Sequence, residues 1–448
     1  MPRARRSRPA AVLCLAAIGC SLPAWAQEPG DAAVPADHFD FAFTGGAIQS
    51  DNVMREAVDE ESGTIGRIGL DLSYARKSRR LDTDVDLNLN YETYPADTFD
   101  DGFFGGGSAG LVFGILPERI DWLVQENYGQ ITSSPFVADT PDNREDINYF
   151  TTGPKFRFQL GGAARLDFSA NYSDFRYETR GEDGNSWGGL IAVVRELSQS
   201  SSLSLNLGGD HYDFDDAANG AYDRYSAYLS YSARGSRTDI EADLGYTRLD
   251  MDDDTPDGLL ARLNVTRQVS ASVSLSATLG TEFSTAGDLF RDGQDQIGAG
   301  IETGQVIASS DPFTSRYGSL GISFDKHRTS LSLDIRFEQE RYENEIAQDR
   351  NLVRYNLSAR RVLSPVLEFS LFGELEQQDF ENVDFESDDT RLGSYLNWRL
   401  GRHVSLRFQY DHYDRDSTGD SGAYQENRVS AFVIWSPIAS PGPSAPIP

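Results

Sequence analysis

The stretch LDTDVDLNLNY at residues 81–91 carries the pattern that the rest of this chain repeats. Its odd positions are apolar or Thr and end in Tyr, and its even positions are Asp or Asn. Because the side chains of a strand point alternately to opposite faces, this segment has one apolar face and one strongly polar face. Three Asp and two Asn on one face suit water better than a neighbouring sheet. The segment is typical of a strand between lipid and an aqueous lumen.

About twenty such segments follow one another, and none of them reads as an amphipathic helix. The first two span His38–Gln49 and Thr64–Ala75, and the last spans Tyr424–Trp435. Short polar or basic turns, beginning with residues 76–80, alternate with longer acid-rich loops. Nine turns and ten loops in alternation predict twenty strands with both termini on the turn side. Eighteen strands is the alternative if the first or eighth is miscounted. The predicted fold is all-β, a transmembrane antiparallel up-and-down barrel over residues 38–436.

Residues 1–26 have the features of a secretory signal peptide. Four arginines between Arg3 and Arg8 precede the apolar run Ala10–Leu22, and Ala24-Trp25-Ala26 forms a cleavage site. A lipoprotein signal ending at Cys20 is the alternative, although an apolar stretch follows that cysteine. Both cysteines of the chain lie in this segment, so the mature protein has no disulfide. A leader at 27–37 and a Pro-rich tail at 437–448 flank the barrel.

The chain carries 40 basic and 70 acidic residues, a formal net charge of −30. Nucleic acid is excluded as a partner for so acidic a surface. With 39% hydrophobic and 11% aromatic residues, the chain is also unlike a disordered acidic protein. These features predict the outer membrane of a Gram-negative bacterium as its location. The expected partners are outer-membrane lipids, lipopolysaccharide and the barrel-assembly machinery.

The charges predicted to face the lumen are the main functional candidates, because mixed rings of charge set selectivity in barrel pores. These pore candidates are Asp82, Asp84, Asp86, Asp334, Arg336, Glu338, Arg354, Glu374, Arg399, Arg407 and Asp411. The alternative is a charge-paired wall that only keeps the lumen wet. An excess of acids predicts preference for cations or neutral solutes. The longest loop, Ser284–Pro312, is expected to form either a constriction or an outer flap.

Catalytic and metal sites are not expected. Only His211 and His412 lie near loop-side strand ends, and a hydrolase would also need a nucleophile and an orienting partner beside the imidazole. Acidic clusters at 213–216, 250–254 and 384–389 lack the spacing of a calcium loop. We therefore expect no enzyme activity, no cofactor and no metal.

Three short motifs resemble a family of outer-membrane β-barrel proteins, of the β-barrel porin type, from bacterial exopolysaccharide and exosortase loci. They are SDNV at 50–53, QENYGQ at 125–130, and NREDIN at 143–148 followed by TTGP at 151–154. The resemblance implies a channel that helps a surface or extracellular polysaccharide, or a related solute, across the outer membrane. It implies no catalytic residues. Two other readings stay open: a non-conducting docking barrel of a secretion complex, and a barrel-embedded enzyme that modifies lipid or glycan.

Overall fold

The computed structural model describes residues 37–178, 183–215, 220–251, 254–294, 307, 309–418 and 422–437, with backbone only at 291–294. The predicted signal peptide, both cysteines, nearly all of the leader and the tail from residue 438 lie outside this range.

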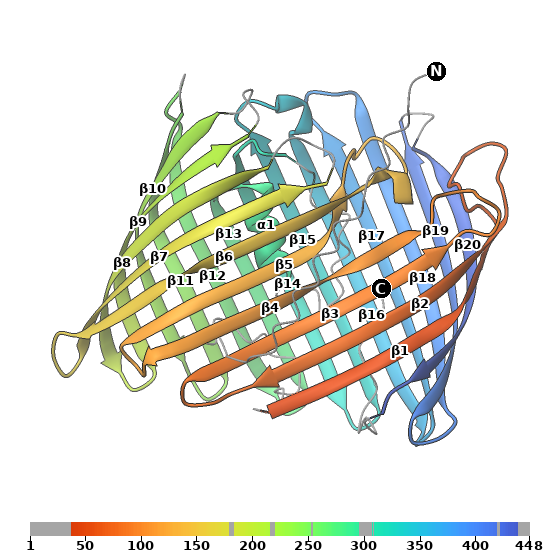
Figure 1. Cartoon of the computed structure of the whole chain (residues 1–448), viewed down its shortest axis with the longest axis horizontal. Coiled ribbons are helices and arrows are strands. Elements are labelled where there is room, and N and C mark those ends of the chain that lie inside the picture. The colour runs from red at the N-terminus through yellow and green to blue at the C-terminus, as the bar shows by residue number, and fades with distance from the viewer. Residues whose placement is uncertain are drawn as a thin grey trace.

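Twenty antiparallel strands form one closed barrel (Figure 1). Each strand pairs with its neighbours in sequence, and β1 also pairs with β20, so the sheet has closed on itself. This confirms the predicted all-β barrel and its twenty strands. The strands are β1 (Asp37–Ser50), β2 (Gly63–Arg76), β3 (Leu81–Thr93), β4 (Gly102–Leu116), β5 (Ile120–Thr132), β6 (Arg144–Gln159), β7 (Ala164–Tyr177), β8 (Gly184–Ser198), β9 (Ser201–Phe214), β10 (Ala221–Arg234), β11 (Thr238–Asp250), β12 (Asp257–Ser270), β13 (Val273–Ser284), β14 (Phe313–Lys326), β15 (Thr329–Tyr342), β16 (Arg350–Ser364), β17 (Leu367–Phe380), β18 (Phe385–Arg399), β19 (Val404–Ser417) and β20 (Tyr424–Trp435).

In the residues that the structure describes, helical structure lies in the loops. The helix α1 (Ala286–Gln294) follows β13, and two 3-10 turns occupy Pro141–Asn143 and Ile346–Gln348. In the described part of the chain, no helix reaches the length and apolarity needed to cross a membrane. None of the twenty strands expected from the sequence is replaced by a helix, and α1 lies in the loop after β13, where no helix was predicted. Nine residues that include two glycines give too short a periodic pattern to stand out in the sequence.

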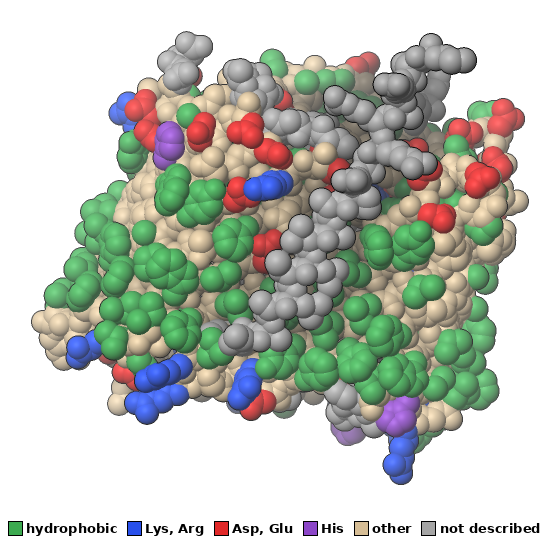
Figure 2. All heavy atoms as spheres, viewed as in Figure 1, with side chains coloured by type: hydrophobic (Ala, Val, Ile, Leu, Met, Phe, Trp, Pro, Cys, Tyr) green, Lys and Arg blue, Asp and Glu red, His purple; other side chains and the backbone are tan. Residues whose placement is uncertain are grey.

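The two faces of the strands differ as the alternation requires. Large apolar side chains such as Leu244, Leu320 and Val429 are 60–64% exposed on the outer face. Figure 2 shows apolar side chains spread over the middle of the outer face in view, with acidic groups toward the loop end and basic groups toward the turn end. A closed barrel with this apolar exterior satisfies its backbone hydrogen bonds internally and presents hydrocarbon to lipid. The protein lies in the outer membrane of a Gram-negative bacterium.

The position of a charge on the outer face decides how much it destabilises the barrel. Leu244 lies at the centre of β11, opposite Leu229 of β10 and Ala261 of β12. We expect Leu244→Arg to lower the free energy of unfolding by about 2–4 kcal/mol, because the guanidinium would sit near the membrane midplane. Leu197→Arg, at the turn end of β8, is the control and should cost about 0–1 kcal/mol. Urea unfolding in lipid vesicles measures both, and equal losses would contradict the assigned membrane position.

Candidate functional site

The pore candidates occupy the inner face of two groups of strands, β3 and the neighbouring strands β15 to β19. Asp82, Asp84 and Asp86 lie on β3; Asp334, Arg336 and Glu338 lie on β15; Arg354, Glu374 and Arg399 lie on β16, β17 and β18; and Arg407 and Asp411 lie on β19. The structure brings together Arg336 with Glu338 at 3.0 Å and Arg354 with Glu374 at 3.3 Å. The β3 carboxylates are not brought to these groups, since they lie beyond the β1–β20 seam. Arg399 lies at the turn end of β18.

Ion pairs continue along the inner wall from β15 to β17. Arg350 binds Glu340 at 2.8 Å, and Arg354 also binds Glu376 on the neighbouring strand. Both arginines are almost fully buried. Carboxylates held this way contribute less net field to the lumen than their number suggests, because each has a guanidinium at contact distance. This part of the wall fits the charge-paired interpretation.

The loop between β5 and β6 folds across the mouth of the barrel. Its base is closed by the Ser133 N–H, which donates to the Asn143 carbonyl at 2.9 Å. At its tip, the Phe136 ring packs against Phe380 and Phe385 of β17 and β18, with centroid distances of 4.9 and 5.2 Å. Since those strands lie across the β1–β20 seam from β5, this loop covers part of the opening.

Backbone contacts with β19 hold the same loop tip. Arg415 Nη2 donates to the Pro135 carbonyl at 2.8 Å, and its Nη1 donates to the Val137 carbonyl at 3.4 Å. Neither bond depends on the identity of the loop side chain. The loop position is therefore fixed by its backbone path as well as by Phe136.

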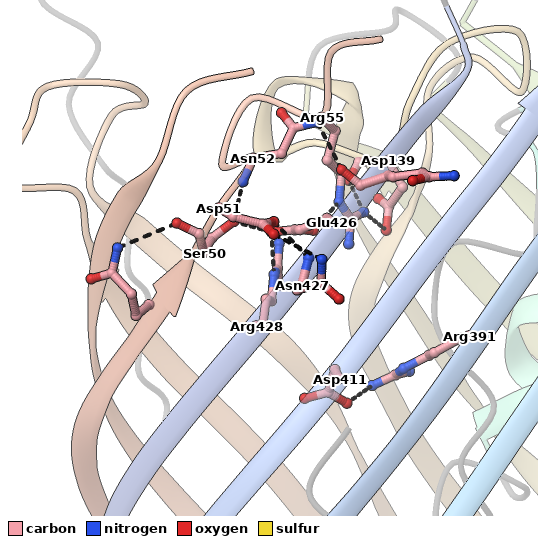
Figure 3. Close-up of polar contacts among 12 residues, drawn as sticks. Ser50, Asp51, Asn52, Arg55, Asp139, Arg391, Asp411, Glu426, Asn427 and Arg428 are labelled. Atoms are coloured by element: carbon pink, nitrogen blue, oxygen red, sulfur yellow. Dashed lines mark hydrogen bonds and ion pairs between the residues drawn. The ribbon is translucent and has the colours of Figure 1, made fainter.

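An ion cluster, which we call the mouth latch, joins this loop to β20 through buried Arg55, partly exposed Asp139 and buried Glu426 (Figure 3). Arg55 lies in the β1–β2 loop with a φ of 55° and is 6% exposed. Its Nε is 2.9 Å from Glu426 Oε2, and its Nη1 is 3.4 Å from Asp139 Oδ2. The guanidinium also lies 4.8 Å from the Tyr413 ring centroid. Two external loops and the last strand thus meet at one arginine.

Each carboxylate of the mouth latch has a second partner. Asp139 is held by Arg144 through two hydrogen bonds of 2.9 Å. Glu426 is fully buried, and its Oε1 accepts hydrogen bonds from Ser50 Oγ and Arg428 Nε, both at 2.6 Å. Charge-assisted hydrogen bonds of this kind are about twice as strong as neutral ones. The latch is therefore a specific contact and not a loose surface pairing.

The electrostatics of Asp139 predict how the latch responds to acid. Burial alone would raise the pKa of Asp139, but the guanidinium groups of Arg144 and Arg55 hold the pKa of that carboxyl well below its usual range. A carboxyl whose pKa is depressed on folding adds stability above its unfolded pKa of about 3.9, and this is lost only as pH falls through the folded value.

We therefore expect the open fraction of single channels to be the same at pH 7 and pH 5. Asp139→Asn should raise it at both values, because the amide removes the charge that Arg55 and Arg144 bind. Asp142→Asn, on the exposed side of the same loop, is the matched control. An increase in opening of the unmodified protein at pH 5 would contradict the role given to Asp139.

The Ser284–Pro312 segment also folds inward where it is described. Helix α1 places Phe290 in an apolar cluster on the inner wall of β5–β13 that includes Tyr149, Tyr212 and Tyr222. Asp288 binds Arg224 of β10 at 2.8 Å. Figure 1 shows α1 within the outline of the barrel. The described part of this segment therefore fits the constriction and not the outer flap.

The two loop-side histidines, His211 and His412, have simple polar partners. His211 Nδ1 is 2.8 Å from Asp223 Oδ1, and His412 Nδ1 is 2.9 Å from Asn427 Oδ1. Neither contact brings a serine or threonine hydroxyl to an imidazole. Within the described ranges, no group of three or more His, Cys, Asp or Glu side chains is arranged to hold a metal ion.

The mouth latch was not predicted from the sequence, although two motifs that carry the family resemblance flank it. From the first motif, Ser50 binds Glu426, and Asn52 Nδ2 donates to the Gln425 carbonyl at 2.9 Å. From the third, Asn143 closes the base of the β5–β6 loop and Arg144 holds Asp139. The available signal was that both motifs combine amide and charged side chains at loop-side strand ends.

Comparison with solved structures finds similar chains at low sequence identity. The siderophore receptor PirA from Pseudomonas aeruginosa is 12% identical, with a TM-score of 0.44, over 90% of this chain and 81% of that one. The ferric citrate transporter FecA is 10% identical, with a TM-score of 0.46, over 90% and 79%. The copper transporter OprC is 10% identical, with a TM-score of 0.44, over 90% and 83%. No protein-family model and no curated protein sequence matches the chain.

Proposed function

We propose that this protein is a gated outer-membrane conduit that helps a surface or extracellular polysaccharide, or a related solute, across the membrane. The observation that carries the proposal is the position of the β5–β6 loop. It covers part of the mouth of a twenty-stranded barrel and is held to β20 and to the β1–β2 loop by the mouth latch. Barrels of 16–18 strands already leave an aqueous channel, so twenty strands leave room beneath this loop. The polysaccharide cargo is taken from the family resemblance.

The form of the latch supports gating. A packed hydrophobic plug would expose apolar surface on leaving, whereas the mouth latch consists mainly of ion pairs and hydrogen bonds between polar side chains. Loops that move in order to admit a ligand are drawn from elements with few apolar contacts. In the tip of the β5–β6 loop, Phe136 supplies the aromatic contact with β17 and β18.

Single-channel conductance of the refolded chain from residue 27 onward, measured across a range of salts, tests the proposal. We expect brief, cation-selective openings and a saturable block by glycan. Heat-modifiable migration in gels verifies that the barrel has folded. If the folded barrel shows no conductance, either with its natural loop or with the β5–β6 loop shortened, the protein is not a conduit.

The second candidate is a non-conducting docking barrel of a secretion complex. The position of the β5–β6 loop favours this candidate too. A loop folded into the mouth can close a pore permanently as well as open and close it. Its acidic external loops would then serve as the contact surface. Co-purification of a stoichiometric partner, together with absent conductance, would support this candidate over the conduit.

We also infer that the barrel catalyses no reaction. The contacts of His211 and His412 with Asp223 and Asn427 support this, because they orient the rings without placing a nucleophile beside them. Replacing both histidines with alanine should leave the cellular phenotype intact. Loss of the phenotype with normal barrel levels in the membrane would instead support the hypothesis that the barrel is an embedded enzyme that modifies lipid or glycan.

A further inference from the structure

Three turns of the barrel share a sequence motif that the proposed function does not use. The motif is an arginine, any residue, a leucine or valine, and a serine, and it ends β8, β12 and β16 at residues 195–198, 267–270 and 361–364. In each copy the register of the ladder shifts between the second and the fourth residue. The serine hydroxyl accepts a hydrogen bond of 3.2–3.3 Å from the backbone N–H two residues later. The three arginines therefore occupy the same position relative to the turn.

The arginine of each motif lies on the outer, lipid-facing side of the wall. In β8, Arg195 stands between Val193 and Leu197, which are 45% and 52% exposed. All three arginines are exposed as well. Their cross-strand neighbours toward the next strand are apolar: Leu203, Leu275 and Phe369. Each guanidinium group thus leaves the wall among side chains that contact lipid.

None of the three arginines forms an ion pair with a residue that the structure describes. Arg361 has one side-chain hydrogen bond, from its Nη1 to the Thr329 hydroxyl. A charge on the lipid face is costly at the membrane midplane and costs little near the interface. Because the guanidinium group stays protonated, it is satisfied there by an anion at the level of the lipid headgroups.

The direction and the surroundings of these arginines select a lipid phosphate. A periplasmic protein would reach the turns from the end of the barrel, whereas these side chains leave the wall sideways. Arginine binds a phosphate through two parallel N–H donors. Since the neighbours on the outer face are apolar, they offer no carboxylate to the ammonium group of a zwitterionic headgroup. The sites therefore favour a headgroup with a net negative charge.

A fourth turn has the same register shift without the arginine. At the end of β4 the ladder shifts between Gly114 and Leu116, so Phe113 occupies the position of the motif arginine. The Phe113 side chain is 49% exposed on the outer face. The turn itself therefore does not require an arginine at this position, and the three that are present have another role.

We propose that Arg195, Arg267 and Arg361 bind the phosphate groups of anionic phospholipids in the inner leaflet of the outer membrane, the leaflet that the short turns face. They lie four strands apart, so roughly 19 Å of wall separates them at about 4.8 Å per strand. Each arginine therefore holds its own lipid. This binding fixes the depth of the barrel in the membrane and does not depend on whether the barrel conducts.

Urea unfolding of the refolded chain from residue 27 onward tests the proposal in two kinds of vesicle. One is made of phosphatidylcholine, and the other also contains about one third phosphatidylglycerol. We expect the unfolding midpoint to be higher in the anionic vesicles by on the order of 1 M urea. Equal midpoints would overturn the proposal. Glycerol phosphate added to the neutral vesicles should leave the midpoint unchanged, and a rise of the same size would show that the arginines bind free phosphate and not lipid.

Variants assign this lipid-dependent shift to the motif. The triple variant Arg195→Gln, Arg267→Gln and Arg361→Gln should lose most of it. The matched control replaces three lumen-facing arginines at the same end of the barrel, Arg165→Gln, Arg234→Gln and Arg360→Gln. Both variants lose the same net charge, so a general attraction to an anionic surface weakens equally in both. The control should keep the shift, and an equal loss in the two would overturn the assignment.

Phe113→Arg tests the position by adding a fourth site. We expect it to raise the lipid-dependent shift by about one third, because the side chain enters the same place in a turn of the same form. An unchanged shift would contradict lipid binding at this position. Heat-modifiable migration of every variant shows that a changed midpoint does not come from misfolding.

Discussion

Glu426→Gln is expected to lower the free energy of unfolding of the barrel by about 3–5 kcal/mol. The carboxylate is fully buried and bonded to Ser50, Arg55 and Arg428. The amide keeps the shape but removes the charge, so two guanidinium groups lose their shared counter-ion. Removing one partner from a buried ion pair is far more costly than removing a surface pair, because the remaining charge stays out of water.

Equilibrium unfolding in urea, with the barrel inserted in lipid vesicles and followed by tryptophan fluorescence, measures this loss. Glu386→Gln is the matched control, because Glu386 is exposed on the outer face of β18 at the same end of the barrel. We expect that control to lie within about 0.5 kcal/mol of the unmodified protein. A similarly small change in Glu426→Gln would show that the mouth latch contributes little to the stability of the barrel.

Replacing residues 135–141 with three glycines is expected to raise the mean conductance severalfold. The replacement removes the loop tip that Arg415 and the two phenylalanines hold, but it keeps the hydrogen-bonded base at Ser133 and Asn143. The ladder between β5 and β6 ends at Thr132 and Arg144, so it lies outside the change. The barrel wall should therefore fold as before.

Single-channel recordings of this variant measure the change directly. Replacing residues 95–97 with glycine, on the exposed β3–β4 loop, is the control and should leave conductance as it was. Unchanged conductance in the shortened variant would mean that the β5–β6 loop does not limit passage. The inward-folded segment around α1 would then be the next constriction to remove.

The strands could be predicted from the sequence because one face of each strand contacts lipid and the other faces the aqueous lumen, so apolar and polar residues alternate. The expected last strand, Tyr424–Trp435, agrees with the structure at both ends, and the first two strands are each one residue longer at both ends than expected. The alternation of Leu, Val and Tyr with Asp and Asn in β3 is set by side-chain period alone. No knowledge of neighbouring strands is needed to see it.

The mouth could not be predicted in the same way. Arg55 and Glu426 are 371 residues apart in sequence, and Asp139 lies on a third segment. Their meeting depends on barrel closure and on the path of the β5–β6 loop, neither of which leaves a periodic signal. In the sequence, Asp139 is one acidic residue among many on an acid-rich loop.

The seam between β1 and β20 is a line of mechanical weakness in the wall of the barrel. Phe43–Ser50 of β1 pair with β20, whereas the whole of Asp37–Ser50 pairs with β2. Within the described residues, the turn-side end of this seam is therefore held by ring contacts of Trp435 with Phe41 and Phe43. Lateral separation of β1 from β20 should therefore begin at the turn-side end of the seam. The same short edge is where a nascent wall would be completed last, so the point of closure during biogenesis and the point of rupture under tension coincide.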